Sequence, residues 1–168
     1  TGLFVVEGEK SVNEALTCGL EVISVYYQEE ISTAVMERMT HLSSPSPALA
    51  VVRKPAPRAI SEIFAQGGLK GVSLALDSIR DPGNIGTILR LAEWFGIENV
   101  FASKDCVDIF NPKAVQSSMG SVLRKRVDYV DLMELISLYK SSEIPIYATT
   151  LDGDNIHDAK LSKDNALI

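Results

Sequence analysis

The sequence predicts an α/β protein whose larger part is a mostly parallel sheet. From Lys70 onward, short apolar runs alternate with segments of helical periodicity, which is the pattern of strand–helix–strand units. The 168 residues, 46% of them hydrophobic and 23% charged, can form one large core or two small domains. A stiff Lys-Pro-Ala-Pro stretch at residues 54–57 separates two regions of different composition and predicts a domain boundary.

The first region, residues 1–53, is expected to be a small α/β domain, followed by a linker at 54–69. Ser11 and Glu14 have the spacing of a capping box, and Gly19 suits a helix end. The predicted elements are a strand at 3–6, a helix from about Ser11 to Cys18, a strand at 22–26, a helix at 36–42, a strand at 48–52 and a short linker helix at 60–65.

The second region, residues 70–168, carries the strand–helix alternation. In such sheets, ligands bind outside the carboxyl ends of the strands. The loops Asp77–Gly86 and Thr149–Asp154 fall at such ends and are candidate site loops. The predicted elements are strands at 72–76, 99–102, 127–129 and 145–149, helices at 85–95, 112–119 and 132–141, and the opening of a further strand at 166–168.

Charge and composition restrict the classes of function. The net charge of −6 argues against non-specific coating of nucleic acid, although Lys113 and the triplet Arg124, Lys125 and Arg126 provide local basic groups. For that triplet, a solvated loop before a strand is the alternative. No apolar run approaches the roughly 20 residues of a membrane span.

Cysteine and histidine usage indicates a reduced protein without a metal. Cys18 and Cys106 occupy unrelated contexts, which favours buried thiols over a disulfide. His41 and His157 are too few and too scattered for a histidine metal site. Because no charged segment followed by an apolar run opens the chain, a cytoplasmic location is expected.

The loop and helix at residues 76–96 form the first constellation. Pro82 fixes a turn, Gly83 permits close backbone approach, and Asn84 can cap the helix and present an amide. Arg90 lies off the apolar stripe, as either a solvated or a functional arginine would. Because neither GxxxxGK[ST] nor GxGxxG is present, nucleotide phosphate binding by those motifs is unsupported. Read alone, these residues also fit a plain strand–helix turn.

The second constellation is the stretch Asn111–Val127. Asn-Pro begins a helix, and a run of small residues at 117–121 follows it, so that a ligand or another backbone can come close. Simple packing against a neighbouring helix is the alternative. No Ser/His/Asp or Cys/His arrangement is suggested, because neither histidine lies in these loops.

Together these segments resemble the SpoU-type (TrmH-like) members of the SPOUT superfamily, the RNA 2′-O-ribose methyltransferases. The first constellation, DPGNIGTILRLAEWFGIENV, resembles their first motif, and the second, NPKAVQSSMGSVLRKRV, resembles their second. The opening FVVEGEKSVNEAL resembles the small N-terminal substrate-binding domain that many of them carry. The resemblance thus covers nearly the whole chain.

The resemblance implies a knotted α/β domain that binds S-adenosylmethionine, pairs as a homodimer and methylates a ribose 2′-hydroxyl in structured RNA, either rRNA or tRNA. It assigns Arg90 to that hydroxyl and Asn84 to the amide that helps to build the catalytic site. Cofactor binding is expected at Ser118, Gly120, Thr149, Thr150 and Leu151, and RNA binding at Lys113, Arg124, Lys125 and Arg126.

Two departures from the family pattern limit this expectation. A third motif, a Gly-Asn-Glu loop with a Leu/Asn-rich helix, would follow Ile168, and most of the cofactor pocket is expected from it. The first region also looks short between Glu30 and Ile31. We therefore expect weak cofactor binding by these 168 residues, and their activity stays open. The alternatives are a non-catalytic RNA-binding module of the same ancestry and a small-molecule-binding α/β protein.

Overall fold

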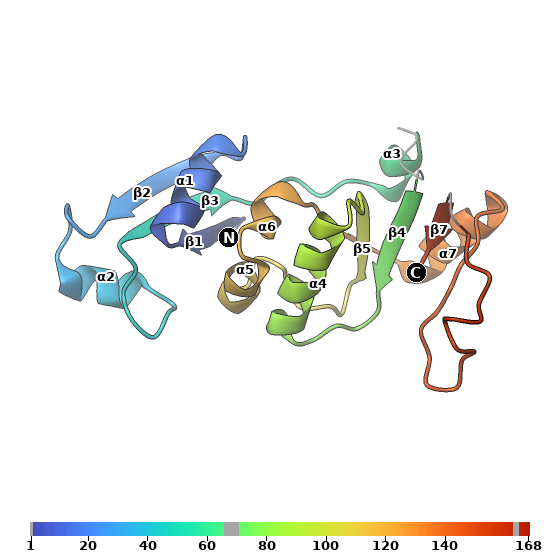
Figure 1. The fold of residues 1–168 in the computed structure, drawn as a ribbon. Helices are drawn as coiled ribbons and strands as arrows, with labels where there is room; N and C mark the ends of the chain where they lie inside the picture. Colours follow the sequence, from blue (N-terminus) through green and yellow to red (C-terminus); the bar gives the residue numbers. More distant parts are fainter. Residues whose placement is uncertain (1, 66–70, 163–164) are drawn as a thin grey trace. The chain divides into compact units, whose positions relative to one another are not determined.

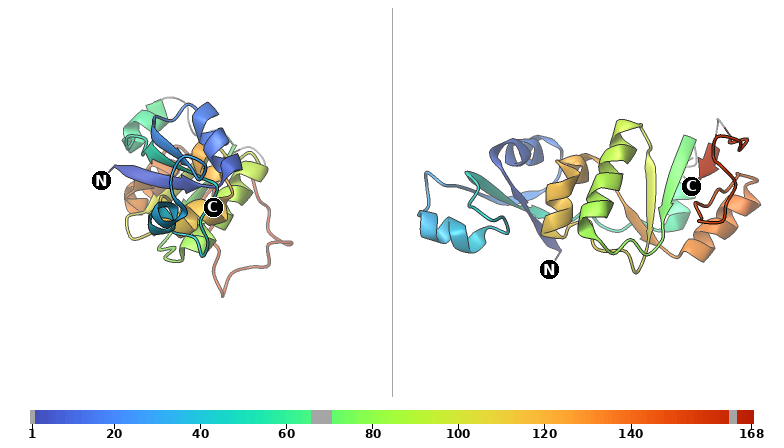
Figure 2. Two further views of the ribbon diagram at one scale, coloured as in Figure 1. Left: turned by 90° about the vertical axis from the view of Figure 1, so that its left-hand side faces the viewer. Right: turned by 60° about the horizontal axis from the view of Figure 1, so that its bottom comes forward.

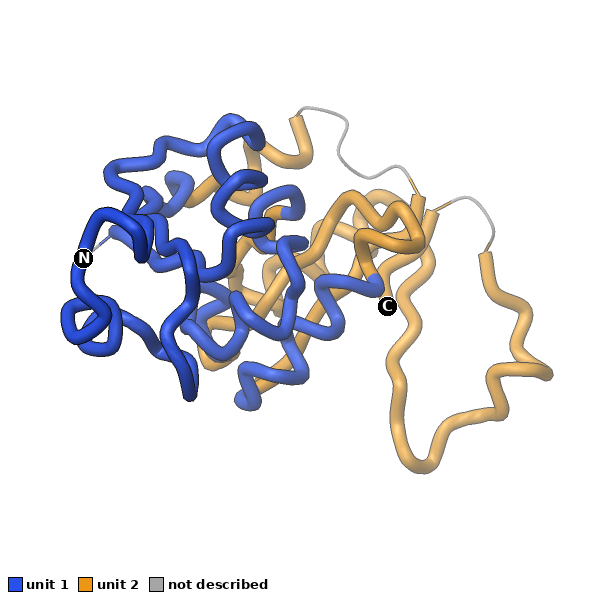
Figure 3. The backbone as a smooth tube through the Cα atoms, turned by 60° about the vertical axis from the view of Figure 1, so that its left-hand side comes forward, with its two compact units in different colours: residues 1–56, 80–91, 107–125 blue, residues 57–79, 92–106, 126–168 orange. Residues whose placement is uncertain are grey.

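The computed structural model describes residues 2–65, 71–162 and 165–168. The chain folds into two compact units, each assembled from three separate stretches (Figure 3). Unit 1 comprises residues 1–56, 80–91 and 107–125, and unit 2 comprises residues 57–79, 92–106 and 126–168. The division into domains at 1–53, 54–69 and 70–168 stays a prediction.

Unit 1 contains a three-stranded antiparallel sheet of order β1-β3-β2 (Figure 1). Alternate side chains of β1 are buried, as the period of two in a half-buried strand requires, and Phe4 and Val6 are among them. Helix α1 buries Val12 and Ala15. The elements are β1 (Leu3–Glu7), α1 (Glu9–Thr17), β2 (Val22–Tyr27), α2 (Thr33–Met39) and β3 (Ala48–Arg53).

Helix α1 begins earlier than the capping-box spacing predicts. Gly8 is its N-cap residue, with a φ of 100° that favours glycine, and the carbonyl of Gly8 accepts the N–H of Val12 at 2.8 Å. Ser11 therefore lies inside the first turn, and the predicted start at Ser11 is wrong. The predicted end is confirmed by Gly19, whose φ is 85°.

Unit 2 contains a four-stranded parallel sheet of order β6-β5-β4-β7, which confirms the predicted α/β class. Helices α3 and α7 contribute Ile63, Leu135 and Tyr139 to one core with Phe101 of β5. The Tyr139 ring meets the ring of Phe101 edge-on at 6.5 Å. The elements are α3 (Ile60–Ala65), β4 (Gly71–Leu76), β5 (Asn99–Ser103), β6 (Asp128–Val130), α7 (Leu132–Ser141) and β7 (Asn165–Leu167).

The strand predicted at 145–149 is wrong, because it is reduced to one parallel bridge between Ile146 and Leu167. Pro145 has no N–H to donate, and β7 is only three residues long, so no longer ladder forms. Beyond Tyr147 the chain runs as an exposed loop up to residue 161, which extends away from α7 in Figure 1. The N–H of Ser162 donates to the Tyr147 hydroxyl at 2.8 Å.

Three helices carry the two sequence constellations. Helix α4 (Pro82–Trp94) follows the loop after β4, and helices α5 (Pro112–Ser118) and α6 (Ser121–Arg124) follow β5. The side of α5 lies against the first half of α4, and the right-hand view of Figure 2 shows the two helices side by side with α4 in yellow-green. Helix α6 was not predicted, because four residues are too few to show a helical period.

Candidate functional site

Asp81 starts the helix that carries the first constellation. Its carboxylate accepts the N–H of Asn84 at 2.8 Å, and its carbonyl accepts the N–H of Ile85 at 3.2 Å. Pro82 occupies the first helical position, where its missing N–H costs no hydrogen bond. Asn84 therefore lies inside the first turn with an exposed side chain, and its predicted role as the cap is wrong.

The hydrogen bond from Asn84 lowers the pKa of Asp81 below its ordinary range, and the charge of Lys113 lowers it further. The Lys113 ammonium lies 3.7 Å from the Asp81 carboxylate. Asp81 thus stays ionised at neutral pH, and its negative charge interacts favourably with the positive N-terminal end of the α4 dipole. Its role in this structure is to begin the helix.

The loop before Asp81 is held by the turn after β5, within unit 2. Ser78 has a φ of 54°, its N–H donates to the Ser103 hydroxyl at 2.9 Å, and its own hydroxyl lies 3.0 Å from Asp105. The buried Cys106 thiol accepts the N–H of Ile79 at 3.2 Å and lies 3.3 Å from the carbonyl of Leu76. These bonds fix the path of the chain from β4 toward α4.

Gly86 is the point of contact between the two constellations. A Cβ atom at this position would lie 2.0 Å from the Ser117 hydroxyl, 2.6 Å from the carbonyl of Ala114 and 2.9 Å from the N–H of Ser118. Only glycine permits this approach of α4 to α5. The Ser117 hydroxyl also lies 3.1 Å from the carbonyl of Pro82 and thereby links the two helices.

Arg90 stands one helical turn beyond Gly86, on the same side of α4. The residue is exposed, and its guanidinium has no hydrogen-bond or ion-pair partner among the residues that the structure describes. An arginine without a partner beside a closely packed helix pair can bind a phosphate or steady a developing negative charge. This arrangement fits the role that the resemblance assigns to it.

Two of the predicted cofactor residues, Ser118 and Gly120, lie in unit 1 at the end of α5. The Ser118 side chain is buried, and its hydroxyl donates to the carbonyl of Val115 at 2.7 Å. Gly120 has a φ of 90°, and a Cβ atom there would lie 2.5 Å from the Glu14 carboxylate. Both residues serve local packing in this structure, and cofactor binding by them stays a prediction.

The remaining predicted cofactor residues, Thr149, Thr150 and Leu151, lie in unit 2 in the loop that follows the Ile146 bridge. All three are exposed, and Leu151 is fully so. Their hydroxyls and apolar side chain are available to a ligand.

The predicted RNA-binding residues divide by their partners. Lys113 is exposed at the first turn of α5, whereas Arg124 forms an ion pair with Glu14 of α1. Arg126 donates to the buried Asp128 carboxylate at 2.9 Å. Arg58 pairs with that carboxylate too, and the hydrogen bond raises the pKa of Arg58. Lys125 is half-buried. The structure thus gives the two arginines of the triplet intramolecular partners.

Within the described ranges no group of three or more His, Cys, Asp or Glu side chains has the arrangement of a metal site. In the same residues, no helix combines the length and the apolar character that crossing a bilayer requires.

Sequence reasoning missed several residues that build this arrangement. The Asp-Pro pair at 81–82 is a signal for a helix start that points to Asp81 as the cap. Ser117 was noted only as part of a run of small residues and Gly86 only as the end of the loop Asp77–Gly86, and nothing local indicates that they meet. The pairing of Glu14 with Arg124 joins residues 110 positions apart and leaves no local pattern.

Solved structures with this fold define the class of protein. A structure from Porphyromonas gingivalis, assigned to the TrmH family of RNA methyltransferases, is 28% identical with a TM-score of 0.81, and the match covers 99% of this chain and 71% of that one. The AdoMet-bound rRNA methyltransferase from Sinorhizobium meliloti is 23% identical with a TM-score of 0.82, over 99% of this chain and 69% of that one. The fold is that of SpoU/TrmH-type methyltransferases.

The sequence comparisons identify the family. The family model for the SpoU rRNA Methylase family matches residues 71–168, and the chain belongs to this family. The chain is 27% identical over 179 residues to the 23S rRNA (guanosine(2553)-2′-O)-methyltransferase RlmP of Bacillus subtilis, a match that covers 100% of this chain and 71% of that protein. The matches to several other curated rRNA or tRNA methyltransferases cover less than a third of the length of those proteins.

Proposed function

We propose that this chain catalyses, or forms the larger part of a protein that catalyses, the S-adenosylmethionine-dependent methylation of a ribose 2′-hydroxyl in rRNA or tRNA. The observation that carries the proposal is the exposed Arg90 guanidinium, free of partners among the described residues, on the helix that Gly86 locks against α5. Family membership and the similarity to a 2′-O-methyltransferase support the same reaction.

The residues present fit the cofactor in their chemistry. S-adenosylmethionine carries ribose hydroxyls and an adenine ring, and Thr149, Thr150 and Leu151 offer exposed hydroxyls and an exposed apolar side chain to such groups. When bound, the cofactor supplies an electrophilic methyl group on a sulfonium. In this proposal the Thr149–Leu151 loop holds part of it.

Arg90 acts on the RNA. A ribose 2′-hydroxyl has a high pKa and is a poor nucleophile, so its attack on a methyl group needs its proton polarised or removed. A guanidinium stays charged at neutral pH and stabilises the negative charge that develops on the oxygen. The same planar fork can hold the neighbouring phosphate and fix the ribose in position. Asn84, exposed in the first turn of α4, adds an amide to this site.

The proposal includes a homodimer in the cytoplasm. Support for the dimer comes from large hydrophobic side chains at the end of α4, where Trp94 is 84% exposed and Phe95 is 72% exposed.

Transfer of a labelled methyl group from S-adenosylmethionine to total rRNA and tRNA tests the proposal. We expect the label in nucleotides that resist alkaline hydrolysis, as 2′-O-methylated ribose does. Arg90→Ala should lower the rate by about 10²- to 10³-fold, as the loss of one charge-stabilising donor does. RNA affinity should change far less. Arg38→Ala, which removes an arginine from the last turn of α2, is the matched control.

Full activity of Arg90→Ala would remove Arg90 from the catalytic role. RNA binding without methyl transfer by the unaltered chain would favour the non-catalytic RNA-binding module. Absence of both would favour the small-molecule-binding protein.

A further inference from the structure

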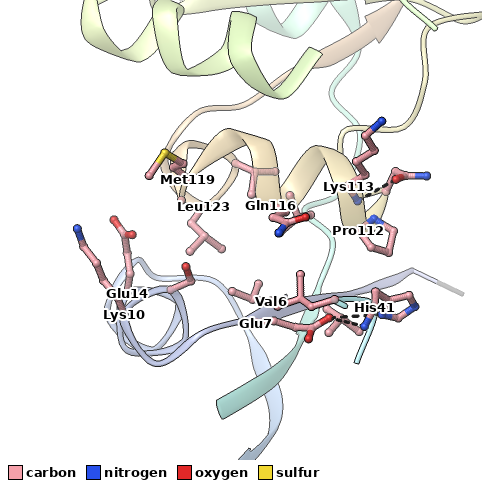
Figure 4. Close-up of a pocket in the computed structure, with 17 residues that line it drawn as sticks. Val6, Glu7, Lys10, Glu14, His41, Pro112, Lys113, Gln116, Met119 and Leu123 are labelled. Atoms are coloured by element: carbon pink, nitrogen blue, oxygen red, sulfur yellow. Dashed lines mark hydrogen bonds and ion pairs between the residues drawn. The ribbon is translucent and has the colours of Figure 1, made fainter. Parts of the chain in front are cut away.

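A cavity of about 790 Å³ lies within unit 1 (Figure 4), and Arg90 is not among the residues that line it. We call this cavity the slot. Residues of β1 and α1 form one of its walls, and residues of α5 and α6 form the opposite wall. Its volume is in the range of sites that enclose a small molecule. Its apolar lining consists mainly of buried side chains, namely Val6, Val115, Val122 and Leu123.

The carboxylates that line the slot are already paired. Glu7, whose side chain is 8% exposed, accepts the backbone N–H of His41 at 2.9 Å and the hydroxyl of Thr40. Glu14 pairs with Arg124. The chain's own donors thus satisfy the carboxylates of the slot, and the Arg124 guanidinium offsets the charge of Glu14.

The donors of the slot, in contrast, are left for a ligand. Lys10 and Gln116 have no side-chain partner among the described residues, and Lys113 has one long ion pair of 3.7 Å with Asp81. Figure 4 shows Lys10 and Lys113 at opposite ends of the slot, with the Gln116 amide between them and directed from α5 toward β1, while the Lys113 side chain points away from β1. A ligand that matches these donors carries negative charge at two separated points, one for each lysine, and a flat apolar group between them.

We propose that the slot binds an unpaired nucleotide of the RNA substrate, an inference that rests on the proposed function. The base lies against the apolar walls, and the Gln116 amide, which both donates and accepts, bonds its edge. Lys10 binds the phosphate on one side along the strand, and Lys113, once its side chain turns from Asp81, binds the phosphate on the other side. Met119, 68% exposed beside the slot, supplies a polarisable side chain to the face of the base.

An unpaired nucleotide within a strand meets these requirements, whereas a paired base and a free nucleotide do not. A base within a duplex is stacked on both faces and cannot enter a walled cavity, whereas single-stranded loops present bases that side chains can surround. A free nucleotide carries its charge at one end and leaves one of the two lysines without a phosphate. The slot therefore selects a loop or bulge at a fixed distance along the RNA from the methylated ribose.

Two RNA probes test the inference with the chain as it stands. One is a fluorescently labelled hairpin with a seven-nucleotide loop that contains one 4-thiouridine, and the other is a fully paired duplex of equal length. We expect fluorescence anisotropy to show tighter binding of the hairpin. After irradiation and trypsin digestion, the thiouridine should be cross-linked to peptide 114–124, which contains Gln116 and Met119.

Substitutions at the slot give the second readout. Lys10→Ala should weaken hairpin binding and lower the slope of log affinity against log salt concentration by about 1, as the loss of one phosphate contact does. Gln116→Ala should weaken binding about two- to tenfold with the slope unchanged. Lys140→Ala, which removes an exposed lysine from α7, is the matched control. Because Lys10 and Gln116 are exposed, the thermal unfolding of both variants should match the unaltered chain.

The outcomes separate the two proposals. Hairpin binding and methyl transfer that survive both substitutions, with the cross-link in another peptide, overturn the slot and leave the proposed function intact. Equal affinity of the slot for free uridine monophosphate and for the hairpin would also overturn the RNA assignment. Absence of binding to any RNA, together with absence of methyl transfer, overturns the proposed function and the slot with it.

Discussion

At the scale of single residues, Asp81 and Gly86 position the candidate site around Arg90 through contacts within the chain. The Asp81 carboxylate satisfies a free N–H at the start of α4, and Gly86 leaves room for the backbone of α5. Arg90 follows at the next turn and is the residue that remains available. Asp81 and Gly86 therefore serve to place Arg90.

The pKa of Asp81 makes the helix start sensitive to acid. Because the folded state lowers this pKa, the stabilisation is present above the ordinary carboxyl pKa of about 3.9 and is lost as the pH falls through the lower folded value. We expect Asp81→Ala to lower the midpoint of thermal unfolding at pH 7, and the difference from the unaltered chain to shrink as the pH falls below the ordinary carboxyl range. Circular dichroism at several pH values measures the difference.

Asp81→Asn is the control for the charge, since an amide oxygen can still cap the helix. It should retain part of the stabilisation at pH 7 and show a weaker dependence on pH. A difference between Asp81→Ala and the unaltered chain that persists unchanged at pH 2 would contradict the role of the ionised carboxylate.

At the scale of elements, the contact of α4 with α5 joins two stretches that are separated in the sequence. The contact depends on backbone atoms of α5, since the carbonyl of Ala114 and the N–H of Ser118 would lie within 3 Å of any Cβ at position 86. Unlike the Ser117 hydroxyl, those atoms cannot rotate away. A larger residue must push the helices apart.

Gly86→Ala should therefore destabilise the chain although alanine favours helices. The overpacking costs about 1–3 kcal/mol and exceeds the gain of about 1 kcal/mol in helix propensity. Urea unfolding measures the free energy. Gly83→Ala is the control, because a Cβ there meets no backbone atom and approaches only the Asp81 side chain closely. If Gly86→Ala equals or exceeds the unaltered chain in stability, the close contact does not hold in solution.

Local patterns predicted most elements, and the failures have physical causes. Helix α7 matches its predicted bounds of 132–141 because Asp131 caps it and an apolar period runs through it. The strand at 145–149 failed because apolar character alone does not supply a partner ladder, and β7 provides only three residues. The motif suggested Arg90 as a site residue, and its role stays a prediction, whereas the slot depends on α1 meeting α6 and has no local signature.

At the scale of the whole molecule, a net charge of −6 and exposed aromatic side chains indicate different kinds of partner. An acidic chain binds RNA through local donors, since its overall field repels phosphate. Exposed aromatic side chains such as Trp94 instead favour a protein surface, because aromatic residues are enriched in interfaces.

We expect the chain to sediment as a dimer that Trp94→Ser weakens by at least about tenfold, in keeping with the loss of a buried aromatic anchor. Analytical ultracentrifugation over a range of concentrations measures the dissociation constant. Ile156→Ser removes another exposed hydrophobic side chain, 63% exposed in the loop after Ile146, and should leave the dimer unchanged. A chain that stays monomeric at all concentrations, or equal effects of both substitutions, would rule out a dimer through α4.

The tight fit at Gly86 has a consequence for how the sequence of this family can evolve. Because backbone atoms of α5 limit the space at position 86, no change of side chain at 117 can make room for a larger residue there. A genetic screen that begins with Gly86→Ala should therefore return revertants to glycine at 86 rather than suppressors at 117. Lineages of this family should then keep glycine at position 86 while the residue at 117 varies.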